Sequence, residues 1–327
     1  LNNRLSLIYD YFVRETKNMF GPAESLPATL GASAPKRNNA DLQTKGFEMQ
    51  IAWRDKIGDL GYNMAFNLSD NQTTITRYKN DNGVLSDYYV GRKIGEIWGY
   101  NTVGIYQSQE EADAGPDQTY FFSRWGEGDI EYADLNKDGK INPGNNTLDD
   151  HGDLSIIGNS TPRFSYGINL GLDWKNFDLS VFCQGVGKRD AAPSGNMFYG
   201  ITGDVWQSSV FVQHLDYWSS ENPNAYYPKP YLGTNEHSKN IQTQTRFLQN
   251  AAYFRLKSFQ FGYTLPVEKK IKFPIEKIRF FITGENLFTL TKMNKTFDPE
   301  TAFVGAYGSG KAYPLRRTFS FGLNVDL

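Results

Sequence analysis

Residues 164–183 read FSYGINLGLDWKNFDLSVFC and show the pattern that recurs through the chain. Large apolar residues occupy every second position up to Trp174, and Ser, Gly, Asn and Asp stand between them. A period of two residues is the pattern of a β-strand with two chemically different faces. Lys175-Asn176 then predicts a tight turn, after which the alternation resumes from Phe177. The stretch therefore predicts an antiparallel β-hairpin.

The same pattern recurs on both sides of this hairpin. In one example, Leu60, Met64 and Leu68 belong to an apolar face, whereas Asn63 and Asn67 belong to a polar one. Alternation of this kind predicts further strands at residues 5–13, 47–53, 60–69, 256–265, 278–288 and 319–327. The chain is therefore expected to be all-β.

Three features favour a membrane barrel over a soluble β-sandwich, which would also alternate. The predicted strands reach about ten residues, which is long enough to cross a bilayer with tilt. Aromatic residues recur near the strand ends, as they do at membrane interfaces. The polar face is built from Gly, Asn, Ser and Asp, which suits a crowded, wet lumen. The chain has no apolar run of roughly 18 residues, so no transmembrane helix is predicted.

The connections between the predicted strands give an independent indication. They are short at 55–59, 175–176 and 266–276, and long at 69–163, 185–250 and 289–315. Alternating short and long connections are typical of periplasmic turns and extracellular loops. Because so few strands rarely carry such long loops, we expect the chain to be part of a larger barrel.

Composition argues against several other classes. The formal charge of −2 over 327 residues gives no electrostatic reason to expect nucleic-acid binding. Cys183 is the only cysteine, so an intrachain disulfide is excluded, and we expect a small buried or lipid-facing residue there. His151, His214 and His237 lack metal-ligand spacing. No nucleophile elbow, Walker loop or dinucleotide fingerprint is present, so no catalytic residue is predicted.

The sharpest local motif is DLNKDGKIN at residues 134–142, inside a predicted extracellular insertion at 125–160. Oxygen-bearing side chains at alternate positions, followed by Gly139, match the start of a calcium-binding loop. The alternative is an Asx-rich turn held by its own side-chain hydrogen bonds. The predicted Ca²⁺ ligands are Asp134, Asn136, Asp138, Lys140 through its carbonyl group, Asn142 through water, and Asp153 as the closing carboxylate, with Asp149 and Asp150 as rivals.

The long connection at 185–250 is rich in aromatic residues, with amide and carboxylate residues between them. Aromatic faces beside polar groups could stack on sugar rings, so we expect some of them to bind substrate. The alternative is that they pack the loop onto itself or onto a partner. The candidate substrate-binding residues are Trp206, Tyr217, Trp218 and Tyr226.

An ordered series of sequence blocks resembles the SusC-like family of TonB-dependent transporters. The blocks span nearly the whole chain, and their order is specific to the family. They are Asn39-Ala40, Lys45-Gly46-Phe47-Glu48, Val90-Gly91, Ile94-Gly95, Gly99-Tyr100, Gly104-Ile105-Tyr106-Gln107, Gly128-Asp129-Ile130-Glu131-Tyr132, Ile157-Gly158-Asn159-Ser160-Thr161-Pro162, Phe177-Asp178-Leu179-Ser180, Gln184-Gly185, Phe261-Gly262-Tyr263-Thr264-Leu265-Pro266, Gly284-Glu285-Asn286-Leu287-Phe288, Asp298-Pro299-Glu300 and Tyr313-Pro314-Leu315-Arg316-Arg317.

This resemblance implies that residues 1–327 are the C-terminal part of a transmembrane barrel of about 22 antiparallel strands, with long extracellular loops. It implies a multi-pass protein of a Bacteroidetes outer membrane, in contact with its lipid. A SusD-like surface lipoprotein would cap the barrel, and TonB would act on an N-terminal plug that this sequence lacks. An oligosaccharide is the expected nutrient and a peptide the alternative. The rivals are a siderophore or cobalamin receptor without a lid, and a soluble carbohydrate-binding β-domain.

Overall fold

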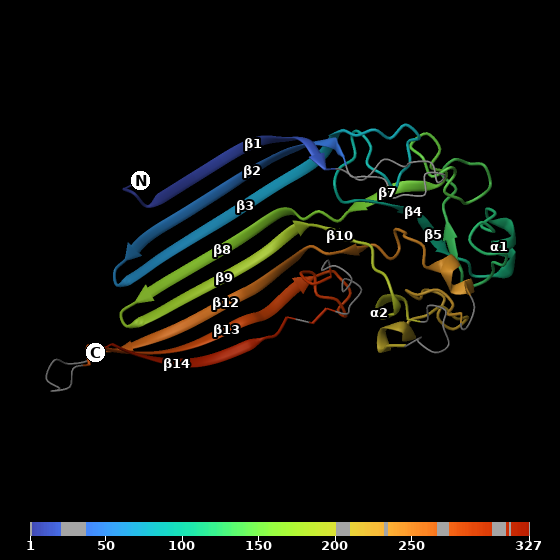
Figure 1. Cartoon of the computed structure of the whole chain (residues 1–327). Helices are drawn as coiled ribbons and strands as arrows, with labels where there is room; N and C mark the ends of the chain where they lie inside the picture. Colours follow the sequence, from blue (N-terminus) through green and yellow to red (C-terminus); the bar gives the residue numbers. More distant parts are fainter. Residues whose placement is uncertain are drawn as a thin grey trace.

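The computed structural model describes residues 2–20, 37–200, 210–231, 235–266, 275–302, 312–313 and 315–326. Its main feature is a sheet of eight long strands in which every strand pairs antiparallel with the next along the sheet (Figure 1). In sheet order they are β1 (Leu5–Phe20), β2 (Asn38–Ile57), β3 (Leu60–Arg77), β8 (Arg163–Trp174), β9 (Phe177–Lys188), β12 (Tyr253–Leu265), β13 (Lys277–Thr291) and β14 (Thr318–Asp326). The predicted all-β class is confirmed.

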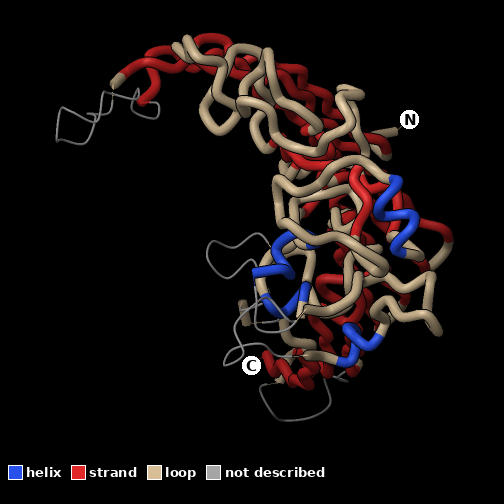
Figure 2. The backbone as a smooth tube through the Cα atoms, turned by 90° about the vertical axis from the view of Figure 1, so that its right-hand side faces the viewer, coloured by secondary structure: helices blue, strands red, loops and turns tan. Residues whose placement is uncertain are grey.

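The connections divide between the two ends of the sheet as predicted. Those after β2, β8 and β12 are short, and those after β3, β9 and β13 are long. The described parts of the long ones gather at one end of the sheet, where we call residues 78–162, 189–200, 210–231, 235–252 and 292–302 the cap. Figure 2 views the molecule from this end, with the cap spread in front of strands that follow an arc.

Short elements give the cap its frame. Two small antiparallel pairs join β4 (Glu96–Tyr100) to β7 (Leu154–Asn159) and β5 (Thr102–Ile105) to β6 (Ile130–Tyr132). The other cap elements are β10 (Asp190–Ala191), β11 (Gln249–Asn250), α1 (Gln109–Ala114), α2 (Asn196–Tyr199) and the 3-10 helices η2 (Val212–Leu215) and η3 (Asn235–Asn240). Among the helices of the described residues, none is long and apolar enough to cross a membrane.

The strand register aligns residues of one chemical kind in rows across the sheet. Side chains of paired residues point to the same face, so each row belongs to one face. One apolar row runs through Leu7, Ile51, Phe66, Ile168, Cys183, Leu256 and Phe288. The neighbouring row on the other face runs through Gln50, Asn67, Gly167, Gln184, Arg255 and Thr289. The predicted separation into an apolar and a polar face therefore holds across these strands.

The apolar face is open to the surroundings. Phe319 and Phe321 on β14 are 75% and 72% exposed, and Leu7, Met64 and Ile282 are also exposed. A soluble protein seldom leaves so large an apolar area uncovered. The face thus has the character of a surface made for hydrocarbon or for another apolar partner.

The polar face is closely packed where small residues meet large ones. Gly322 pairs with Phe281 across β14 and β13, and a Cβ atom at Gly322 would overlap the Phe281 ring. Arg279 reaches across β12 to Asp178 on β9, with 2.9 Å between Nε and Oδ1. Glycine residues therefore leave enough space on this face for an aromatic ring or for an ion pair between side chains of two different strands.

Candidate functional site

The cap has a hydrophobic core of its own. Tyr132, Phe198, Phe247 and Phe297 are buried in one cluster, although they come from three different long connections. Phe198 stands edge-on to Phe247, with 5.8 Å between the ring centroids. Aromatic pairs of this geometry stabilise beyond the area that they bury. The long connections are thus packed as one body and not as separate loops.

A buried lysine fixes two of these connections to each other. The Lys239 ammonium lies 2.7 Å from an Asp129 carboxylate oxygen and 3.0 Å from Glu236, and it donates to the Arg124 carbonyl group. Lys239 is only 1% exposed, and Asp129 is fully buried. The other Asp129 oxygen accepts hydrogen bonds from Tyr231 and from the Asn240 amide. Both charges are therefore paired, and the pair links segment 124–130 to η3.

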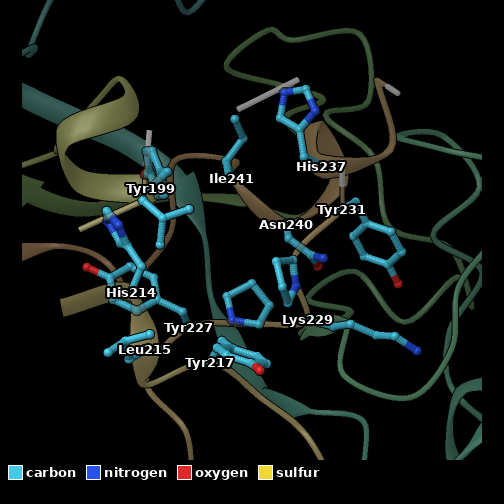
Figure 3. A pocket seen from close by; sticks show the side chains of 13 residues that line it. Tyr199, His214, Leu215, Tyr217, Tyr227, Lys229, Tyr231, His237, Asn240 and Ile241 are labelled. Carbon is cyan, nitrogen blue, oxygen red and sulfur yellow. The ribbon is translucent and has the colours of Figure 1, made fainter. Parts of the chain in front are cut away.

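A hollow of the cap lies beside this ion pair. It has a volume of about 270 Å³, and Figure 3 shows side chains around it from all sides. Most of the lining is aromatic or aliphatic, with a few polar groups among it. The lining side chains shown in Figure 3 include Tyr199, His214, Leu215, Tyr217, Tyr227, Lys229, Tyr231, His237, Asn240 and Ile241. We call it the cap pocket. Ligand sites of proteins commonly combine an apolar lining with a few polar groups.

Burial acts on two titratable groups of the cap pocket, His214 and Tyr231. His214 Nδ1 accepts the Phe211 N–H, which leaves Nε2 to donate to the Phe198 carbonyl oxygen 2.9 Å away. Burial lowers the pKa of the His214 imidazole. Burial and the Asp129 carboxylate raise the pKa of the Tyr231 hydroxyl group. Both shifts favour the neutral form of these two rings, and the half-buried Lys229 side chain lies at the edge of the pocket, with its ammonium 3.6 Å from a Glu127 carboxylate oxygen.

The four predicted substrate-binding aromatics have different places. Tyr217 lines the cap pocket and is 41% exposed. Trp218 is buried in the cap core, where its indole N–H donates to Gln107 Oε1. Tyr226 packs against the same core, and its hydroxyl oxygen accepts from the Gln249 amide. Trp206 lies outside the described residues.

Several residues of the cap pocket were not predicted from the sequence. Tyr231 and Lys229 belong to the run Pro228-Lys229-Pro230-Tyr231, in which two prolines restrict the backbone. This proline-containing run is the sequence feature that could have indicated Lys229 and Tyr231. Lys239 gave no such signal, because its partner Asp129 lies 110 positions away in the chain.

In the loop predicted to bind calcium, the side-chain oxygens accept hydrogen bonds from backbone N–H groups of the same loop. Asp134 accepts the N–H groups of Lys137 and Gly139, and Asn136 Oδ1 accepts that of Asp138. Asp138 in turn accepts the N–H of Lys140 at 2.8 Å. This is the hydrogen bonding of consecutive Asx turns, with Gly139 at a φ of +79°.

The predicted closing carboxylate, Asp153, is fully buried at the base of the same loop. One of its oxygens accepts the Leu135 N–H at 2.8 Å, and the other accepts the Asn142 N–H at 2.9 Å. Asp150 instead binds Asn145 in a separate turn. Within the described part of the chain, no three His, Cys, Asp or Glu side chains form a group suited to a metal ion. The geometry fits the Asx-turn alternative, and calcium binding stays a prediction.

A second ion cluster joins the cap to the sheet. Arg255 on β12 is 1% exposed and binds Thr289, Asp298 and Glu300, with 2.8 Å between Nη1 and Glu300 Oε1. Lys257 binds the other oxygen of Glu300 at 2.8 Å. The Asp298-Pro299-Glu300 block thus anchors the connection after β13 on the polar face of the sheet.

Comparisons with known proteins agree with this arrangement. No family model matches the chain. TonB-dependent receptor P3 of Formosa agariphila is 28% identical over 357 aligned residues, which cover 99% of this chain and 32% of the receptor. TonB-dependent receptor P26 of the same organism is 22% identical, with coverage of 99% and 33%. The chain spans about a third of the length of the curated relatives that it matches. The predicted resemblance to TonB-dependent transporters is confirmed.

Solved structures show the same fold. The RagAB peptide importer in its 'open-open' state superposes with a TM-score of 0.72 at 21% identity, covering all of this chain and 33% of that one. The structure of the RagAB peptide transporter gives 0.71 at 20% identity, covering 99% and 34%. These relatives are described as receptors and transporters, in agreement with the absence of predicted catalytic residues.

Proposed function

We propose that this chain forms part of the wall and the outer cap of a TonB-dependent importer in a bacterial outer membrane. The observation that carries the proposal is the division of the sheet into an uncovered apolar face and a polar face. The long connections after β3, β9 and β13 lie at one end of this sheet. A barrel wall needs this division, because hydrocarbon meets one face and the aqueous lumen meets the other. The curated relatives support the TonB-dependent class.

In this proposal the chain has three physical tasks. Its apolar rows seal the barrel against lipid. Its polar face, with ion pairs such as Arg279–Asp178, lines a wet route for the nutrient. Its cap presents the pocket to the outside, where a SusD-like surface lipoprotein would close over captured ligand. TonB would act through a plug domain outside this sequence, and the outer membrane is the proposed location.

The proposed nutrient is an oligosaccharide, bound in part at the cap pocket. The ring of Tyr217 is exposed at the pocket, and Lys229, which pairs with Glu127 at 3.6 Å, places polar groups at its edge. An aromatic face beside polar groups suits a sugar ring, which has apolar faces and hydroxyl edges. One observation favours a peptide as the second candidate, since Leu215, Ile241 and Val210 make much of the lining aliphatic.

The test is ligand binding to the intact receptor purified with any lipoprotein that accompanies it. Calorimetry with a glycan panel and a peptide panel identifies the ligand class. Replacing Tyr217 with Ala should weaken binding of the ligand by about fivefold or more, because truncation of a tyrosine that contributes strongly to binding costs more than about 1 kcal/mol. Tyr120→Ala is the matched control, since Tyr120 is exposed outside the pocket.

Three outcomes distinguish the candidate functions. Binding of glycans that Tyr217→Ala weakens and Tyr120→Ala leaves intact supports the proposal. Binding of peptides alone replaces the oligosaccharide with the second candidate. A receptor that purifies without any lipoprotein and binds a siderophore or cobalamin contradicts the proposed partner and nutrient.

A further inference from the structure

A second hollow lies on the apolar face of the sheet, at the end opposite the cap. It has a volume of about 450 Å³ and opens to the surroundings. We call it the wall groove. Its apolar lining comes from four neighbouring strands and consists of Leu60, Leu172, Trp174, Phe177, Leu179 and Phe261. The groove therefore belongs to the surface that faces lipid in the proposed function.

The register explains why this surface is hollow. Leu172 pairs with Leu179, and Leu179 pairs with Phe261, so two leucines stand in a row that continues into a larger ring. In the next row Trp174 stacks on Phe177, with 6.2 Å between ring centroids. Phe177 also stacks on Phe261 at 5.8 Å. The rings rise above the shorter leucines, and the leucines become the floor of the groove.

The lining is almost free of competing polar groups. Asp178 is the one charged residue of the lining, and its side chain belongs by register to the polar face, where Arg279 binds both oxygens of the carboxylate. The exposed Trp174 and Phe261 leave the groove accessible along its length. An occupant therefore has to be apolar where it contacts the floor and the walls.

A cation stands at the end of the groove. Lys175 lies in the turn between β8 and β9, with its ammonium 5.1 Å from the centroid of the Trp174 ring. No ion pair of Lys175 with a carboxylate is found among the described residues. A lysine at the edge of a hydrocarbon-facing surface is well placed to meet an anionic headgroup.

We propose that the wall groove holds an acyl chain of one phospholipid molecule, with Lys175 binding its phosphate. The inference rests on the barrel wall of the proposed function. Apolar lining and a terminal cation match the two chemically different parts of a phospholipid. The groove is also continuous with the apolar rows of the sheet, because Leu179 and Phe261 belong to a row that runs on through Ile282 to Phe321. A second copy of the chain is the competing occupant.

Native mass spectrometry of the intact receptor tests the proposal. The receptor is purified in a mild detergent and washed until bulk lipid is gone, and retained phospholipid is counted per molecule. Leu179→Phe should fill the floor and reduce retention at least tenfold. Lys175→Asn removes the charge and keeps a residue that tolerates the positive φ of 54° at this turn, and it should also reduce retention. Leu290→Phe is the control, because Leu290 is exposed outside the groove.

The outcomes separate this inference from the proposed function. One retained phospholipid that both groove variants lose and the control keeps supports the inference. If the receptor inserts into liposomes, two results overturn the inference. Either all four proteins retain the same amount of phospholipid, or the unchanged receptor retains no phospholipid. A dimer that Leu179→Phe dissociates assigns the groove to a second copy. Failure of the intact receptor to insert into liposomes overturns the barrel wall itself.

Discussion

Replacing Lys239 with Met should loosen the cap without unfolding the sheet. Methionine has nearly the length of lysine, so the change removes a charge and leaves little empty volume. The ammonium that is lost lies 2.7 Å from Asp129 and 3.0 Å from Glu236, and it is 1% exposed. The variant thus leaves the buried Asp129 carboxylate without its cation.

Breaking a buried ion pair by removing one partner typically costs about 3–5 kcal/mol. Since about 1.36 kcal/mol is a factor of ten, the open population of this part of the cap should rise roughly 100-fold to several thousand-fold. The cost is local, because Lys239 joins segment 124–130 to η3 and does not contact the eight-stranded sheet in the bonds described above.

Hydrogen exchange of the intact receptor measures this opening. The reporters are the N–H of Gly126, which Asp129 accepts, and the N–H of Ile130, which Asn240 accepts. Both should exchange faster by the stated factor, whereas amides of the sheet should keep their rates. Lys292→Met, at an exposed position of the cap, is the control. If the exchange rates of both reporters stay within about threefold of those in the unchanged receptor, Lys239 does not hold segment 124–130 to η3.

Three further predictions concern other parts of the molecule. If the loop at 134–142 binds calcium, a chelator should lower the melting temperature of the intact receptor and Asp134→Ala should abolish that difference; an unchanged melting temperature removes the prediction. Burial lowers the pKa of His214, so the unfolded cap binds a proton more readily than the folded one, and cap stability should be full above the ordinary pKa of 6.5 and fall as the pH decreases below it. A His214→Gln variant should lose that dependence in melting curves recorded from pH 7.5 to 5, and identical curves would contradict it. Gly322→Ala should destabilise the sheet by about 1–3 kcal/mol through contact with Phe281, whereas Gly104→Ala, with no atom within 4 Å, should not, as urea titration of the intact receptor would reveal.

Sequence reasoning predicted the alternating part of each strand and missed the extensions. The predicted strand at 47–53 is the middle of β2, which runs over 20 residues from Asn38 to Ile57. Alternation is visible only where one face of a strand is apolar and uncovered and the other is polar. Nearer the cap, Ala40 and Ile75 pack against loop residues, so both faces of the strands are covered and the period of two fades.

The cap was less predictable because its contacts join distant segments. Tyr217 and Trp218 are neighbours in one aromatic, polar stretch, yet one lines the cap pocket and the other is buried. What separates them is Trp218's contact with Gln107 and with Gly128, about a hundred positions away. The loop at 134–142 was recognisable as a motif, but its oxygens serve calcium ligation and Asx turns equally well in sequence.

Single-cysteine labelling of β3 in the intact receptor tests the barrel wall most directly. With Cys183 replaced by Ala, cysteines are placed one at a time at positions 62 to 68, and a water-soluble maleimide is compared with quenching by a lipid-phase spin label. A barrel wall predicts strict alternation. Probes on cysteines that replace Tyr62, Met64, Phe66 and Leu68 should be quenched from lipid, and cysteines that replace Asn63, Ala65 and Asn67 should be labelled from water. Uniform labelling from water at all seven positions would contradict a membrane wall and favour a soluble β-domain.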